Sequence, residues 1–178
     1  MSETDPLAPS VTIRAVRPEE HEAVGALMVA AYVADGFIDA SSPYVARLAD
    51  TATRAAGAEV LVAVERPPTG PGPGRLVGTV TYCPAGSEWR EIARADEGEF
   101  RMLAVLPEAR GMGIGGALVR ACLDRARAEG RAGVAISSMA PTRPRVECWA
   151  HRWLPQPAHS TRVRRAGTGI GRRRPPRG

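Results

Sequence analysis

Apolar and polar residues alternate along the chain with two different periods, which predicts a domain of mixed helices and strands. Residues 11–16 alternate with a period of two, as in a half-buried strand. Residues 17–33 begin with the sequence R-P-E-E, and a proline followed by two acidic residues is typical of the first turn of a helix. A serine pair and a proline at 41–43 predict the start of a second helix, with Tyr44 and Leu48 on a weak apolar stripe.

The second half of the chain contains further strands and one amphipathic helix. Two β-rich runs, 60–64 and 76–82, flank a Pro/Gly-rich turn and predict an antiparallel hairpin. A strand at 100–105, a helix at 114–129 and a strand at 134–138 follow. The expected order is β, α, α, β, β, β, α, β. This order indicates an α/β (α+β) domain with a mixed, mostly antiparallel sheet flanked by helices.

Composition limits the class of protein. The chain has 178 residues, of which 44% are hydrophobic, and this suits one domain. It contains no lysine, which excludes a Walker A phosphate loop. The three cysteines form no CxxC pair, the N-terminus does not resemble a signal peptide, and no apolar run is long enough to span a membrane. We expect a cytoplasmic protein with no membrane partner and no metal site.

Charge divides the chain into two parts. Residues 1–144 carry 15 arginines against 18 acidic residues, whereas residues 145–178 carry 9 arginines against one glutamate. We therefore expect a disordered N-terminus at 1–9, a folded domain at 10–143, and an Arg/Pro-rich, disordered tail at 144–178.

A glycine-rich loop carries the clearest chemical signal. The predicted strand at 100–105 runs into the sequence R-G-M-G-I-G-G at 110–116, which opens directly into a helix. Free N–H groups of a first helical turn favour an anion, and glycines let a phosphate approach the backbone closely. Arg110 adds positive charge. The segment therefore predicts a phosphate cradle at a junction between strand and helix.

Two other interpretations of this loop compete with a phosphate cradle. Gly111, Gly113 and Gly116 satisfy the GxGxxG pattern of dinucleotide-binding proteins. That fingerprint should follow the first strand of a βαβ unit and precede an acidic residue about 20 residues on, and the chain provides neither. The second alternative is a glycine-rich turn that only packs the helix against the sheet.

The residues R-G-M-G-I-G at 110–115 resemble the Q/R-x-x-G-x-G/A signature of the GCN5-related N-acetyltransferase (GNAT) family. The preceding M-L-A-V-x-P at 102–107 resembles the strand that enters this loop, and the resemblance extends over residues 10–140. It implies a GNAT-like fold and acetyl-CoA as cosubstrate, with the strand backbone contacting pantetheine and the loop amides holding the pyrophosphate. The implied cofactor-binding residues are Leu103, Ala104, Val105, Arg110, Gly111, Met112, Gly113, Ile114, Gly115 and Gly116.

The resemblance also implies a reaction, the transfer of an acetyl group to a primary amine of a small molecule or protein, and leaves a homodimer open. The amine must be neutral to attack, so a carboxylate has to take its proton. Glu99 lies four residues before Leu103, a spacing that resembles the glutamate base of members similar to the histone enzyme. Glu97 is the next candidate. The alternative for Glu99 is a solvated charge at a strand end.

The segment between the first two helices is the candidate acceptor site, because the same region lines the acceptor pocket in the family. Tyr32 and Phe37 are expected to pack against an acceptor, and Asp35 or Asp39 is expected to attract an amine. The alternative is a plain connecting loop.

The chain departs from the family after residue 138. The family continues with a helix of pattern L-Y-E-x-x-G-F, whose tyrosine protonates the leaving thiolate, and then a last strand, and neither pattern is present. We therefore expect the C-terminal helix and strand to be missing, which would leave the strand at 134–138 with an unpaired edge. This departure also favours an alternative function, a CoA-binding remnant that lacks turnover.

Three interpretations of the tail stay open. In the least favoured interpretation, the Arg-rich tail binds nucleic acid through its phosphates, with Trp149 and Trp153 stacking on bases. A disordered tail is the simplest alternative. The favoured interpretation is a product of a frameshift, because the change in composition near Pro144 is abrupt and typical of a GC-rich gene read out of frame.

Overall fold

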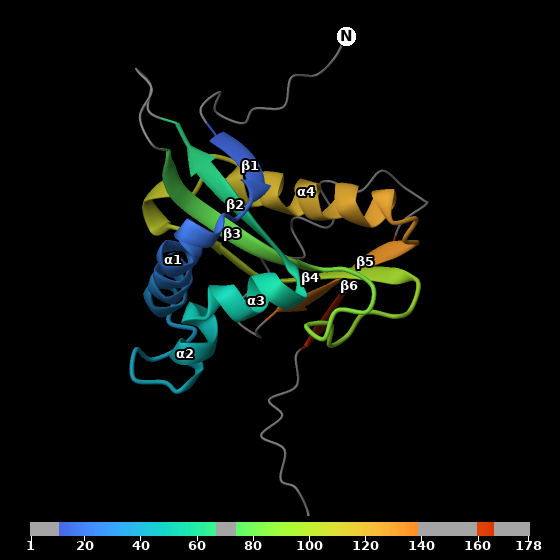
Figure 1. The fold of residues 1–178 in the computed structure, drawn as a ribbon, viewed down its shortest axis with the longest axis horizontal. Coiled ribbons are helices and arrows are strands. Elements are labelled where there is room, and N and C mark those ends of the chain that lie inside the picture. Colours follow the sequence, from blue (N-terminus) through green and yellow to red (C-terminus); the bar gives the residue numbers. More distant parts are fainter. Residues whose placement is uncertain (1–10, 67–73, 139–159, 166–178) are drawn as a thin grey trace, which may run out of the picture.

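A computed structural model describes residues 11–66, 74–138 and 160–165 (Figure 1). The described residues form a six-stranded mixed sheet in the order β1-β2-β3-β4-β5-β6, with helices on both faces. The strands are β1 (Val11–Ala15), β2 (Glu59–Glu65), β3 (Arg75–Cys83), β4 (Glu97–Val105), β5 (Gly133–Ser138) and β6 (Ser160–Arg165).

Strand direction changes in the middle of the sheet. β1 to β4 pair antiparallel with their neighbours, whereas β5 runs parallel to both β4 and β6. The predicted hairpin is confirmed, because β2 and β3 pair from Glu59 opposite Tyr82 to Glu65 opposite Arg75. The α+β class and the mostly antiparallel sheet are also confirmed.

Four α-helices cover the two faces of the sheet. They are α1 (His21–Ala34), α2 (Tyr44–Ala49), α3 (Thr51–Gly57) and α4 (Ile114–Ala128), with short 3-10 turns η1 (Pro18–Glu20) and η2 (Pro107–Ala109). α4 lies against one face, and α1, α2 and α3 lie against the other (Figure 1). The second predicted helix is divided in two at Asp50, whose ψ of 75° is not helical and whose carboxylate caps α3 at the Thr53 N–H.

Each face of the sheet has its own core. On the α4 face, Tyr82 and Phe100 pack against Ile114, Leu118 and the rest of that helix. On the opposite face, buried side chains of α1 and α2 pack against β4. This second cluster comprises Leu27, Met28, Ala31, Leu48, Met102 and Ala104. β4 therefore contributes to both cores, which fixes its position between the two helical layers.

The tail contributes one strand to the sheet. β6 pairs parallel with β5 from Gly133 opposite Ser160 to Ser138 opposite Arg165. The expectation that the edge of β5 would be unpaired is wrong, as is the expectation of a disordered tail at 160–165. The other tail residues, at 144–159 and 166–178, lie outside the described residues.

Among the described residues, none of the helices combines the length and the apolar character needed to cross a membrane.

We predict that Gly25→Ala lowers stability. Gly25 is buried where α1 meets α2, and a Cβ atom there would overlap the carbonyl oxygen of Ala49. Overpacking of this kind costs about 1–3 kcal/mol, although alanine is the better helix former by about 1 kcal/mol. Thermal unfolding should therefore show a lower Tm.

Gly116→Ala is the matched control for Gly25→Ala. It also changes a helical glycine, but its Cβ would meet only the Arg120 side chain at 3.6 Å. The control should unfold at the same or a higher temperature, since alanine favours the helix. A Gly25→Ala protein as stable as this control would contradict the prediction.

Candidate functional site

The site is built where β4 parts from β5. β4 pairs with β5 only over Glu97–Phe100, opposite Gly133–Ile136, whereas β4 continues to Val105. β6 pairs with the other edge of β5 along the whole strand, so among the described residues Ser137 and Ser138 at the end of β5 pair with β6 alone. In the described part of the chain, the last five residues of β4 therefore have a strand neighbour only on the β3 side. Their other edge offers backbone groups to an extended ligand.

A β-bulge accompanies this parting. The register between β3 and β4 shifts between Thr79 and Thr81, and Met102 on the facing strand has a φ of +53°. A left-handed conformation is uncommon for residues other than glycine, and such strain concentrates at functional sites. The bulge turns both Met102 and Ala104 into the core beneath α1.

The glycine loop lies directly after this strand and presents free amides. Gly111 and Gly113 have φ values of +82° and +76°, and Gly113 is the N-cap of α4. The first helical hydrogen bond runs from the Ala117 N–H to the Gly113 carbonyl at 3.0 Å. The N–H groups of residues 111–116 have no acceptor in the described part of the chain. These N–H groups are the donors of the predicted phosphate cradle, and their role in binding stays a prediction.

Arg110 at the start of the loop is not directed at this cradle. Its guanidinium forms a bidentate ion pair with Asp35 at 2.7 and 3.1 Å, and it donates two further bonds of 3.2 Å to the Val105 carbonyl. The structure thus brings together Arg110, predicted for the cofactor, and Asp35, predicted for the acceptor. Their predicted roles as ligands stay predictions.

Tyr32 and Phe37 lie on the α1 side of the same strand. Their rings meet edge to face with centroids 5.7 Å apart, and Tyr32 packs against the cluster that contains Met102 and Ala104. Burial, with a contribution from neighbouring Tyr44, raises the pKa of Tyr32 to about 12, so its phenol stays protonated at neutral pH. Tyr32 therefore adjoins the predicted cofactor strand, and Phe37 lies beside Tyr32.

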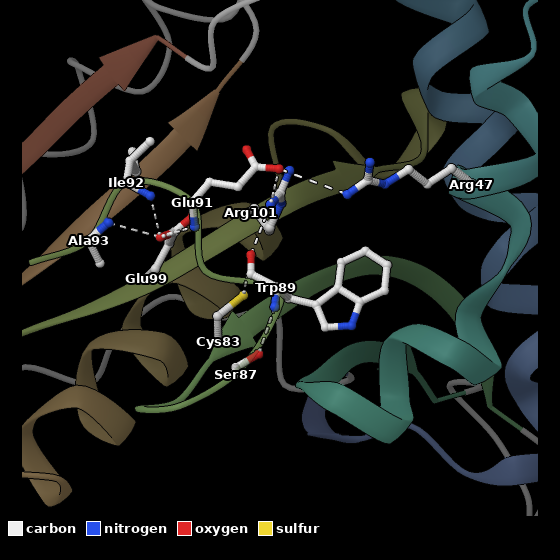
Figure 2. Close-up of polar contacts among 9 residues, drawn as sticks. All are labelled: Arg47, Cys83, Ser87, Trp89, Glu91, Ile92, Ala93, Glu99 and Arg101. Atoms are coloured by element: carbon white, nitrogen blue, oxygen red, sulfur yellow. Dashed lines mark hydrogen bonds and ion pairs between the residues drawn. The ribbon is translucent and has the colours of Figure 1, made fainter. Parts of the chain in front are cut away.

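Glu99 is fully buried and held by a loop. Its carboxylate accepts hydrogen bonds from the backbone N–H groups of Glu91, Ile92 and Ala93, at distances of 3.0–3.2 Å (Figure 2). These hydrogen bonds hold the connection between β3 and β4 close to Phe100, after which β4 and β5 no longer pair. Glu99 is thus not a solvated charge at a strand end. Its role as a base stays a prediction.

Arg101, two residues after Glu99 on β4, also binds the connection between β3 and β4. It is 6% exposed and donates to the Trp89 carbonyl at 2.9 Å, and it pairs with the Glu91 carboxylate at 2.7 Å (Figure 2). Arg47 of α2 lies over the Trp89 ring at 5.4 Å. This network was not predicted from the sequence, because a charged residue within a strand does not indicate which distant carboxylate it pairs with.

Neither buried cysteine is suited to act as a nucleophile. Burial raises the pKa of the Cys83 thiol to about 12 and raises that of Cys122 as well, so both thiols stay protonated. Cys148 lies outside the described residues. Among the residues that the structure describes, no group of three or more His, Cys, Asp or Glu side chains is placed to hold a metal ion.

We predict that Glu99→Gln destabilises the domain. All three N–H groups reach Oε2, so a glutamine oxygen in that place would keep them, but these bonds would lose the carboxylate charge. The amide nitrogen, in the place of Oε1, would then lie 3.2 Å from the Glu91 nitrogen, donor against donor. Charge-assisted hydrogen bonds of this kind contribute about 1.5–3 kcal/mol, and we expect a loss of about 3 kcal/mol in the free energy of unfolding.

Denaturant unfolding measures this loss, with Glu88→Gln as the control. Glu88 is an exposed glutamate of the same connection, and its substitution should change stability by less than about 0.5 kcal/mol. Equal stability of the two variants would show that the buried carboxylate does not hold the loop.

A known protein family matches this chain. A model of the acetyltransferase (GNAT) family matches residues 22–151, which is more than half of the chain. A comparison with curated protein sequences gives no match.

Three solved structures of this family share the fold. A GNAT family acetyltransferase from Brucella melitensis in complex with acetyl-CoA has 26% identity and a TM-score of 0.51, over 75% of this chain and 80% of that chain. A GNAT family acetyltransferase from Staphylococcus aureus has 10% identity and a TM-score of 0.58, over 80% and 82% of the chains. A GCN5-related N-acetyltransferase from Rhodopseudomonas palustris has 20% identity and a TM-score of 0.55, over 78% and 79%. The chain therefore belongs to the GNAT acetyltransferase family.

Proposed function

We propose that the protein transfers an acetyl group from acetyl-CoA to a primary amine of a small molecule or protein in the cytoplasm. The observation that carries the proposal is the free edge of β4 that ends at unpaired loop amides. The amides of 111–116 are proposed to hold the pyrophosphate. The backbone of Leu103, Ala104 and Val105 is proposed to hold the pantetheine arm. The similar protein from Brucella melitensis was solved with acetyl-CoA.

The proposed reaction is a direct attack of the amine nitrogen on the thioester carbon. An arm that starts at the loop and runs back along β4 ends near Phe100, where β4 and β5 meet. The reaction then depends mainly on orientation, because the strand and the loop hold the thioester beside the acceptor. Tyr32 adjoins this strand, Phe37 lies beside Tyr32, and both are proposed to pack against the acceptor.

Glu99 is proposed to take the proton of the amine. Glu99 lies next to Phe100, where the thioester would lie. The backbone N–H groups of the β3–β4 connection fix the orientation of its carboxylate. Because its side chain is fully buried, the proton must reach it through a water molecule or after a shift of the connection between β3 and β4.

Titration with acetyl-CoA, followed by an assay of free thiol release in the presence of added amines, tests the proposal. We expect binding, and release that depends on the amine. Binding without release would favour the alternative, a CoA-binding protein that lacks turnover. A folded protein that does not bind acetyl-CoA would overturn the proposed function.

We predict that Gly111→Ala weakens acetyl-CoA binding. Gly111 has a φ of +82° and open space around its Cβ position, so alanine would be strained by its conformation alone. That strain costs about 1–2 kcal/mol, which should shift the loop and raise the Kd about tenfold. Calorimetric titration measures the change.

Gly86→Ala is the matched control for this substitution. Gly86 lies between β3 and β4, has a φ of +81°, and also has open space around its Cβ position. It should lose similar stability and bind acetyl-CoA as the unchanged protein does. If both variants bind equally well, the loop amides are not the pyrophosphate site.

A further inference from the structure

The guanidinium group of Arg110 donates hydrogen bonds along two of its edges. Its Nη1 and Nη2 atoms meet the two carboxylate oxygens of Asp35 at 2.7 and 3.1 Å. Its Nε and Nη2 atoms meet the Val105 carbonyl, each at 3.2 Å. The side chains of Arg110 and Asp35 are 31% and 21% exposed, so the pair is shielded from most of the solvent. A planar fork is suited to such a double contact, which a lysine cannot form.

The three contact points belong to three parts of the site. Val105 is the last residue of β4, Arg110 opens the glycine loop, and Asp35 is the C-cap of α1. Gly36, with a φ of +68°, then turns the chain into the segment expected to line the acceptor site. The contacts thus connect the end of the cofactor strand, the phosphate loop and the acceptor side.

We propose that Arg110 and Asp35 form a strut that positions the phosphate loop, and that Arg110 does not bind the phosphates of the cosubstrate. This inference rests on the proposed function, in which the loop holds acetyl-CoA. It reassigns both residues from the roles expected from the sequence. Arg110 and Asp35 become positioning residues that act through the loop amides.

The two possible roles of Arg110 predict opposite effects of removing Asp35. If Arg110 binds phosphate, Asp35 competes for it and also repels the polyanion, so Asp35→Asn should tighten acetyl-CoA binding. If Arg110 is a strut, the same substitution loosens the loop and should weaken binding, although it removes a negative charge near the site.

The experiment compares Asp35→Asn with Glu108→Gln by calorimetric titration with acetyl-CoA. Glu108 lies in η2 just before the loop, is 56% exposed, and contacts only Arg75 at 3.6 Å among the described residues. This control removes a negative charge next to the loop without touching the strut. We expect about tenfold weaker binding for Asp35→Asn, and unchanged or slightly tighter binding for Glu108→Gln.

Arg110→Lys gives a second and independent test. Lysine keeps the charge and binds phosphate well as a point charge, but it cannot bridge Asp35 and Val105. If Arg110 and Asp35 form a strut, Arg110→Lys should bind acetyl-CoA as weakly as Asp35→Asn does. The double variant should bind no more weakly than either single variant, because both changes remove one interaction.

Acetyl-pantetheine, which lacks the phosphates, separates a loosened loop from general damage to the fold. Asp35→Asn should bind it as the unchanged protein does, because Arg110 keeps its bonds to the Val105 carbonyl and only the phosphate loop is loosened. Equal losses for both ligands would overturn the proposal, as would tighter or unchanged acetyl-CoA binding by Asp35→Asn. Absence of acetyl-CoA binding by the unchanged protein would instead count against the proposed function itself.

Discussion

The parting of β4 from β5 after Phe100 is the constraint on which the rest of the site depends. A parallel pair of strands normally satisfies its backbone groups along its length, and an open edge within a sheet is costly unless a ligand or another strand fills it. In the described part of the chain, β5 pairs with β6 on its other edge, while β4 continues past Phe100 without a neighbour on the β5 side and has a left-handed residue at Met102. The sheet thus opens toward the loop that precedes α4.

Charged groups hold both ends of this opening; Glu99 and Arg101 are buried, whereas Arg110 and Asp35 are partly exposed. The amides of the β3–β4 connection converge on the Glu99 carboxylate, and Arg101 pairs with Glu91 of the same segment. At the other end, Arg110 joins α1 to the end of β4. Because buried charges are stable only when they are paired and hydrogen-bonded, these contacts fix the distance between the helical layer and the strand. The loop amides remain as the donors that are free for a ligand.

Local features of the site were predictable from the sequence, whereas contacts between distant segments were not. The strand, loop and helix around Gly111 follow from periodicity and from glycines, which act within a few residues. The Arg110–Asp35 pair joins residues 75 positions apart. The bulge at Met102 depends on the register with β3 and has no glycine to mark it. Its spacing makes Glu99 a candidate base, and this role stays a prediction. Its three amide partners come from a connection without periodicity, which the sequence pattern does not reveal.

β6 shows a second limit of sequence reasoning. The tail is rich in arginine and lacks a clear strand pattern, yet residues 160–165 add to the sheet. Pairing with an existing edge depends on backbone hydrogen bonds, which any residue except proline is able to form. Composition alone therefore did not predict that the edge of β5 would be covered.

Hydrogen exchange with and without acetyl-CoA tests the central claim most directly, because the claim assigns the cosubstrate to backbone groups. The account predicts strong protection of the amides at 103–105 and 111–116 when acetyl-CoA is added. It also predicts little change in β1 and β2, which lie at the far edge of the sheet. Protection elsewhere, with both of these segments unchanged, would contradict it.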